Sequence, residues 1–282
     1  MDAVLLALAS AALFGAMTVL LRPALARGAG AEAGSLLTIL AALALALVAV
    51  AVRGAWAVEG VWPFLVAGIL GPGCSQLLFT LAVRDAGPSR TSVTVGTAPL
   101  FSVAIALVLL DEPVVAGVLA GAVLIVAGGV LLLGERRRPE SFRAIGLAYA
   151  LAATVVFAAR DNLVRWLAID TDVDPALAAA ATLAAGGLTV LAWLAVLRRP
   201  VRLRDAGPFV APGLAFGLSY LFLFEAYYRG RVTVVSPLVA TESLWGVLLS
   251  ALFLRRHERV GARLAAGAGL IVLGGVLIGV FR

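Results

Sequence analysis

The feature that most constrains this chain is a series of long apolar stretches separated by short gaps. A helix that crosses the hydrocarbon core of a bilayer needs about 20 mostly apolar residues. The sequence has ten such stretches, at residues 3–21, 34–52, 61–83, 91–110, 113–134, 142–168, 175–197, 207–228, 232–254 and 260–281. They are too long and too continuous for the alternating strands of a membrane barrel. We therefore predict an all-α integral membrane protein with ten transmembrane helices.

The composition excludes several other classes of protein. Of the 282 residues, 62% are apolar and 13% are charged, whereas a soluble domain averages about 45–50% and about 25%. The single cysteine and single histidine exclude a metal site built from a cluster of these residues. All 22 basic residues are arginine, and nearly all lie between apolar stretches, as in membrane loops. We expect no nucleic-acid partner, no cofactor and, without the lysine of a nucleotide-binding loop, no ATP hydrolysis.

The chain also contains an internal repeat. Residues 112–131 (EPVVAGVLAGAVLIVAGGVL) match residues 258–277 (ERVGARLAAGAGLIVLGGVL) at a shift of 146 positions. Further matches, at shifts of 143 and 144, are Phe14 with Phe157, Arg22 with Arg165, Ser75 with Ser219, and Ser92 with Ser236. We therefore divide the chain into two five-helix units, residues 1–136 and 140–282. Because five is odd, the second unit starts on the opposite side of the membrane, so the repeats are inverted, as in many secondary transporters that bind substrate between their halves near the midplane.

The two units resemble the drug/metabolite transporter superfamily, in its EamA-like branch. The residues that carry the resemblance are the turn Leu110-Asp111-Glu112 with Gly121 and Gly128-Gly129, and its counterpart His257-Glu258 with Gly267 and Gly274-Gly275. The resemblance implies a ten-helix permease in which helices 1, 3, 4, 6, 8 and 9 surround a central cavity, braced by helices 5 and 10. At their turns, Glu112 and Glu258 are expected to stabilise a helix start rather than to bind substrate.

Two arguments about orientation disagree. The loops between spans 1–2, 3–4, 5–6, 7–8 and 9–10 carry 16 of the 22 arginines. The positive-inside rule would place those loops in the cytoplasm and both termini outside. The family resemblance implies the reverse, with both termini in the cytoplasm. The sequence leaves the two orientations open.

Four charged residues lie well inside the predicted spans: Arg160, Asp161, Glu225 and Glu242. Charge is costly there and marks a functional site. Arg160 and Glu242 have no opposite charge one helical turn away, so each needs a partner elsewhere in the protein or in a substrate. Arg160 suits a carboxylate or phosphate, and Glu242 suits an ammonium group or a coupling proton. Together they suit a zwitterion such as an amino acid.

Asp161 and Glu225 admit a second interpretation. Each stands four residues before an arginine, Arg165 or Arg229, in the orientation that favours an ion pair within a helix. Each carboxylate therefore either neutralises that arginine or belongs to the substrate site. The uncharged candidates for the substrate site are Gln76, Thr94, Tyr220 and Trp245.

The sequence therefore predicts a secondary transporter, an exporter of small metabolites such as amino acids, with protons as the candidate coupling ion. The alternative is a multidrug or lipophilic-cation efflux transporter, which would use Glu242 and aromatic residues without Arg160; a non-transporting membrane protein is a third interpretation. The sequence has no pair of acid–base carboxylates in one loop and no nucleophile with a histidine partner, so nothing in it supports an enzyme. We expect a multi-pass plasma-membrane protein, monomer or homodimer, whose partners are the lipid bilayer and a small-molecule substrate.

Overall fold

The computed structural model describes residues 2–27, 30–132, 143–253 and 262–281, and every regular element in them is helical. In the first half these elements are α1 (Ala3–Leu25), α2 (Ala31–Arg53), α3 (Trp62–Gly68), the π-helical segment η1 (Ile69–Cys74), α4 (Ser75–Ala86), α5 (Pro88–Val95), α6 (Ala98–Leu109) and α7 (Ala116–Leu132). In the second half they are α8 (Ile145–Ile169), α9 (Pro175–Val196), the short 3-10 turn η2 (Leu203–Asp205), α10 (Gly207–Arg229), α11 (Val232–Val239), α12 (Glu242–Phe253) and α13 (Ala262–Phe281).

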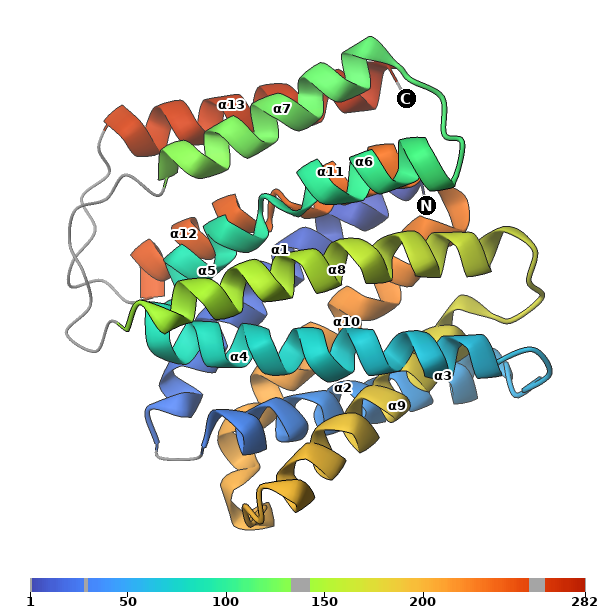
Figure 1. The fold of residues 1–282 in the computed structure, drawn as a ribbon, viewed down its shortest axis with the longest axis vertical. Coiled ribbons are helices and arrows are strands. Elements are labelled where there is room, and N and C mark those ends of the chain that lie inside the picture. The colour runs from blue at the N-terminus through green and yellow to red at the C-terminus, as the bar shows by residue number, and fades with distance from the viewer. Residues whose placement is uncertain (1, 28–29, 133–142, 254–261, 282) are drawn as a thin grey trace.

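These elements form ten spans, because α3, η1 and α4 continue as one span, as do α5 with α6 and α11 with α12 (Figure 1). Among the described residues, six helices are long and apolar enough to cross a membrane, and shorter apolar helices accompany them. The prediction of a ten-helix membrane fold is confirmed. The predicted repeat boundaries, at residues 136 and 140, lie outside the described residues.

The two halves of the chain pack on one another in a reciprocal way. In Figure 1, α1 and α8 run in opposite directions, and the start of α1 lies on the same side of the molecule as the end of α13. The first helix of each half packs against the other half: α1 against α10, α11 and α12, and α8 against α4, α5 and α6. Such an exchange is what inverted repeats related by an axis in the membrane plane produce, and it confirms the predicted inversion.

The fourth helix of each repeat is broken at the same position. In the first repeat α5 ends at Val95 and α6 begins at Ala98, and in the second repeat α11 ends at Val239 and α12 begins at Glu242. Val239 follows Val95 by 144 positions, and Glu242 follows Ala98 by 144 positions, which is a shift that aligns the repeats. Broken helices at the interface of inverted repeats are typical of the binding sites of transporters.

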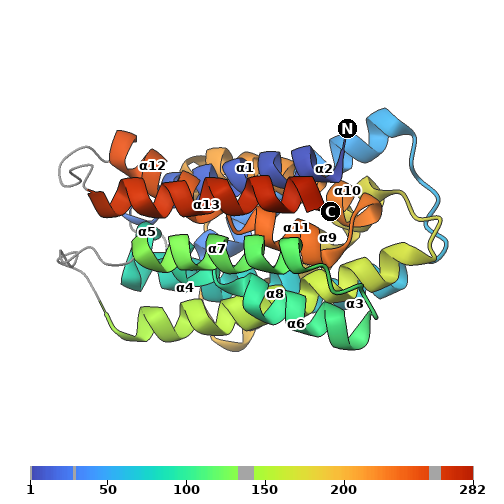
Figure 2. The same ribbon diagram turned by 90° about the horizontal axis from the view of Figure 1, so that it is seen from above.

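The last helices of the two repeats, α7 and α13, lie side by side at one end of the molecule (Figures 1 and 2). A Cβ atom on Gly121 would lie 2.6 Å from the carbonyl oxygen of Gly274, and one on Gly128 would lie 2.6 Å from that of Gly267. The two contacts are equivalent under the repeat. Glycine is needed at these points because it lets two helix backbones approach closely in a membrane, and the pair forms the brace that the family resemblance implied.

An arginine at the end of the first helix of each repeat binds the end of that repeat's third span. Arg22 Nη1 on α1 donates to the carbonyl oxygens of Val83 (3.2 Å) and Arg84 (2.9 Å) at the end of α4. Arg165 Nη1 on α8 donates to the carbonyl oxygen of Tyr227 on α10 (2.9 Å). The last carbonyl groups of a helix lack intrahelical partners and carry partial negative charge. These equivalent bonds therefore satisfy helix ends on opposite sides of the molecule.

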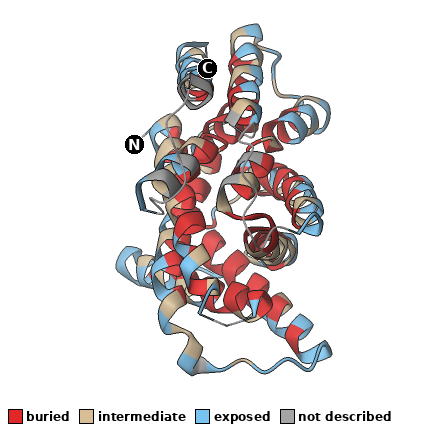
Figure 3. Ribbon diagram, turned by 90° about the vertical axis from the view of Figure 1, so that its left-hand side faces the viewer, coloured by how far each residue is buried: buried red, intermediate tan, exposed pale blue. Residues whose placement is uncertain are grey.

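The apolar residues that remain exposed lie on the outside of the helices, while buried residues line their inner faces (Figure 3). Val52 and Val196 are 82% and 76% exposed. In water, extensive exposed apolar surface is unfavourable, whereas lipid chains cover such a surface in a bilayer. The burial pattern therefore agrees with a membrane environment around the outer faces.

The contact between α7 and α13 provides a test of the fold. Gly121→Ala places a methyl group 2.6 Å from the Gly274 carbonyl oxygen, so the helices must separate, and we expect the free energy of unfolding to fall by about 1–3 kcal/mol. The control is Gly269→Ala on α13, where the new methyl group meets nothing within 4 Å. Thermal unfolding in detergent micelles compares the two; equal melting temperatures would contradict the importance of this contact.

Candidate substrate-binding site

A small cavity lies between the two repeats. The first repeat contributes α1, α5 and α6 to its lining, and the second contributes α8, α10, α11, α12 and the break between the last two. These elements belong to helices 1, 4, 6, 8 and 9 of the ten spans, five of the six that the family resemblance implied. The cavity is thus next to both broken helices, inside the membrane-spanning part of the molecule.

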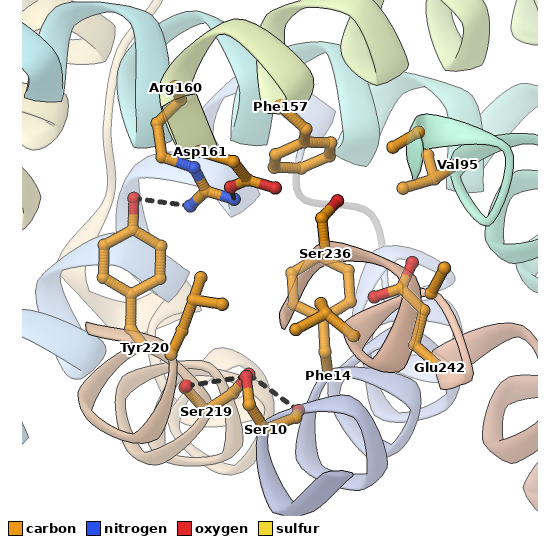
Figure 4. Close-up of a pocket in the computed structure, with 14 residues that line it drawn as sticks. Ser10, Phe14, Val95, Phe157, Arg160, Asp161, Ser219, Tyr220, Ser236 and Glu242 are labelled. Atoms are coloured by element: carbon orange, nitrogen blue, oxygen red, sulfur yellow. Dashed lines mark hydrogen bonds and ion pairs between the residues drawn. The ribbon is translucent and has the colours of Figure 1, made fainter. Parts of the chain in front are cut away.

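Arg160 on α8 lies at one side of the cavity and is 4% exposed. Its Nη2 atom is 2.8 Å from Oδ1 of Asp161, and its Nη1 donates to the hydroxyl of Tyr220 at 3.0 Å (Figure 4). The guanidinium carbon is 5.3 Å from the ring centres of both Phe157 and Tyr220, which is within the range of a cation–π contact. The charge of Arg160 is therefore compensated by the neighbouring carboxylate, and its Nε has no hydrogen-bond partner among the described residues.

Tyr220 joins this arginine to the kink in the third span. Its hydroxyl donates to the carbonyl oxygen of Gly71 at 2.8 Å and accepts from Arg160. Gly71 lies in η1 with a non-helical backbone (φ −141°, ψ 115°), and a Cβ atom on it would lie 2.7 Å from Cγ of Arg160. The kink therefore provides both the acceptor for Tyr220 and the space for the arginine side chain.

Glu242 is the first residue of α12 and lies across the cavity from Arg160 (Figure 4). It is 3% exposed, and its Oε1 has no hydrogen-bond partner in the described part of the chain. No ion-pair partner for it occurs there either. A buried carboxylate without a partner is costly, so its position in the cavity points to a cationic group or a proton that compensates it.

The rest of the lining is largely apolar and comes from both repeats. Phe14 and Phe157, which match each other in the repeat, meet edge to face with ring centres 6.0 Å apart. Val95 and Ala98 line the cavity from the broken helix of the first repeat. The cavity therefore combines apolar side chains of both repeats with the charged side chains of the second repeat.

A pair of serines holds α1 to α10 at the edge of the cavity. The hydroxyl of Ser10 donates to the carbonyl oxygen of Ser219, and the hydroxyl of Ser219 donates to that of Ser10, both at 2.9 Å. Sequence reasoning missed both residues as parts of the site. Ser219 had a signal, its match to Ser75 in the repeat, whereas nothing in the sequence distinguished Ser10.

Three of the uncharged residues predicted for the site lie outside the cavity lining. Gln76 is buried on α4, where its Nε2 contacts Sδ of Met17 at 3.8 Å. Thr94 lies next to the lining residue Val95 and donates to the Arg90 carbonyl oxygen in its own helix. Trp245 on α12 is 38% exposed. A role for these three in substrate binding stays a prediction.

Glu225 and Asp161, the two carboxylates with two interpretations in the sequence, form different kinds of ion pair. Glu225 binds Arg229 four residues along α10, as the sequence predicted, and also binds Arg53 on α2. This geometry favours the neutralising interpretation of Glu225, which lies outside the cavity lining. For Asp161, the interpretation that it neutralises Arg165 is wrong, because Asp161 binds the adjacent Arg160 while Arg165 binds the end of α10. Asp161 lines the cavity, and its role in substrate binding stays a prediction.

No group of three or more histidine, cysteine, aspartate or glutamate side chains that could hold a metal ion occurs among residues 2–27, 30–132, 143–253 and 262–281. The chemistry available in the cavity is therefore that of one arginine, two carboxylates, hydroxyl groups and aromatic rings. Such groups can recognise a small molecule by charge and hydrogen bonding.

Two inverted repeats of five spans around an internal cavity define the class of the protein as a membrane transporter. The model of the EamA-like transporter family matches residues 1–134 and again residues 144–280, so the chain belongs to that family. A solved structure titled "Crystal structure of protein" matches with a TM-score of 0.78 and 23% identity, over 99% of this chain and 97% of that chain; at this identity it shows the fold alone. No curated protein matches. The family identifies a transporter of small molecules and points away from an enzyme.

The link between Tyr220 and the kink can be tested by removing one atom. Tyr220→Phe leaves Arg160 Nη1 and the Gly71 carbonyl oxygen without this buried partner, and we expect a loss of about 1–3 kcal/mol in the free energy of unfolding. Tyr149→Phe, which alters a half-buried tyrosine near the start of α8, is the control. Thermal unfolding in detergent measures both variants, and a melting temperature for Tyr220→Phe no lower than that of the control would contradict the link.

Proposed function

We propose that this protein is a secondary transporter that exports small metabolites bearing an amino group, amino acids among them, across the plasma membrane. In this proposal the ammonium group of the substrate binds Glu242. The carboxylate of an amino acid accepts a hydrogen bond from Arg160, and a proton takes the place of the ammonium group at Glu242 during the return step. Export is then coupled to proton entry.

The observation that carries the proposal is the unpartnered carboxylate of Glu242 in a cavity whose other charges compensate each other. The charged residues of the lining are Arg160, Asp161 and Glu242, and the first two form an ion pair. When all three are ionised the cavity keeps one uncompensated negative charge. A positively charged group is therefore the ligand feature that the cavity favours most, and the unused Nε of Arg160 offers a donor for a carboxylate.

Efflux of lipophilic cations is the second candidate function, and a specific observation favours it. The rings of Phe14, Phe157 and Tyr220 line the same cavity as Glu242, and aromatic faces stabilise cations, including quaternary ones. Such a substrate would need no donor from Arg160. The two candidates therefore differ in whether Arg160 contributes to substrate recognition.

Uptake into proteoliposomes, with and without a pH gradient, separates the two functions. The probes are labelled neutral amino acids, each paired with the amine left when its carboxylate is removed, and tetraphenylphosphonium. We expect Glu242→Gln to lower uptake of amino acids and amines by about 10- to 100-fold, because a charged hydrogen bond is lost. We expect Arg160→Ala to lower uptake of the amino acids only.

The matched control is Glu59→Gln, which neutralises an exposed carboxylate in the connection between α2 and α3 and should transport like the natural protein. Uptake of tetraphenylphosphonium with none of the amino acids or amines would favour lipophilic-cation efflux. Unchanged transport of amino acids and amines by Glu242→Gln would refute the proposed role of this carboxylate.

A further inference from the structure

One acidic side chain of the first repeat binds the second repeat at the start of α11. Glu112 lies in the connection between α6 and α7, and its carboxylate oxygens accept the main-chain N–H groups of Val232 (2.8 Å) and Thr233 (2.9 Å). The N–H of Glu112 itself donates to the carbonyl oxygen of Ala106 on α6 (3.3 Å). The sequence placed Glu112 at the start of the span that follows it, but α7 begins only at Ala116 and has no acidic residue in its first turn. Glu112 instead binds the start of a helix of the other repeat. Glu258, its counterpart, lies outside the described residues.

The start of α11 depends on an acceptor from elsewhere in the chain. The first N–H groups of a helix have no acceptor within the helix, and Arg231, the residue before α11, provides no side-chain cap. Val232 and Thr233 are buried, at 0% and 4% exposure, so water does not replace that cap. A carboxylate at this place accepts charge-assisted hydrogen bonds and complements the helix dipole. Glu112 therefore supplies the cap that α11 lacks.

The other end of α11 forms part of the cavity. Ser236, Val239 and Ala240 line it, and Glu242 follows directly after the break in the helix. α11 has eight residues, which corresponds to a rod about 12 Å long. A helix this short has little stability of its own, so contacts with neighbouring elements decide its position. A shift of the first residues of α11 would therefore also move its last residues, which line the cavity.

We propose that Glu112 is a positioning residue for the substrate site. It fixes the start of α11 from the opposite repeat, and α11 in turn sets the place of Ser236 and Glu242 in the cavity. This inference rests on the proposed function, because it takes the cavity as the place where the transported molecule binds. It assigns to a connection outside the cavity a role in the geometry of the binding residues.

Hydrogen exchange measured by mass spectrometry tests the first step on the full chain in detergent. Glu112→Gln keeps one acceptor oxygen and loses the charge, whereas Glu112→Ala removes both acceptors. We expect exchange in residues 232–239 to accelerate about three- to tenfold in the alanine variant, the range that loss of a helix cap gives, and less in the glutamine variant. Glu59→Gln, which neutralises an exposed acid in the connection between α2 and α3, should exchange like the natural protein.

The rate at which dicyclohexylcarbodiimide, an apolar carboxyl reagent, modifies Glu242 tests the second step. We expect this rate to change at least threefold in both Glu112 variants and to stay the same in Glu59→Gln, because only the former displace α11. A role confined to helix stability would not change the rate, and the glutamine variant keeps the test valid if the alanine variant fails to fold.

Three results would overturn the proposal: unchanged exchange in residues 232–239, unchanged modification of Glu242, or exchange that accelerates equally in α7 and α13. The last result would make Glu112 a residue of general stability. Neither measurement uses a substrate. If amines prove not to be transported, the proposed function fails while the positioning of Glu242 by Glu112 is still tested independently.

Discussion

Inside a bilayer, each main-chain N–H and carbonyl group must find its partner within the protein, because lipid offers none. The described chain departs from regular helix at Gly71 in η1 and at the matching breaks between α5 and α6 and between α11 and α12. At Gly71 a polar group from another element satisfies the backbone, because Tyr220 donates to its carbonyl oxygen. Glu112 likewise binds the first N–H groups of α11, at the end of that helix opposite its break. The irregular backbone is kept next to the cavity, so the constraint that shapes the fold also locates the site.

The scaffold is symmetric, but its chemistry is not. Ala98 and Glu242 occupy equivalent positions just after the two helix breaks, and both line the cavity. One offers a methyl group and the other a carboxylate. Arg160, likewise, corresponds to the apolar Met17 in the first repeat. The repeat explains how the cavity forms, whereas substitutions in the second repeat explain which molecules it favours.

The sequence predicted the spans and the inverted repeat well, because long apolar stretches and a retained glycine pattern are strong signals. It also singled out Arg160 and Glu242, which line the cavity, since charge within an apolar span is conspicuous. It did not predict that Asp161 binds Arg160, because neighbouring residues on a helix point roughly 100° apart and only the long arginine side chain closes that gap. Nor did it show that Tyr220 lines the cavity while Gln76 does not, since helix rotation is set by tertiary packing.

The central claim is that the carboxyl group of Glu242 meets the positive charge of the substrate. Infrared difference spectroscopy, recorded when an amine that the liposomes take up is added to the purified protein, observes that group directly. The account predicts that binding changes a carboxyl band that is absent from Glu242→Gln. A spectrum without such a change, or the same change in Glu242→Gln, would contradict it.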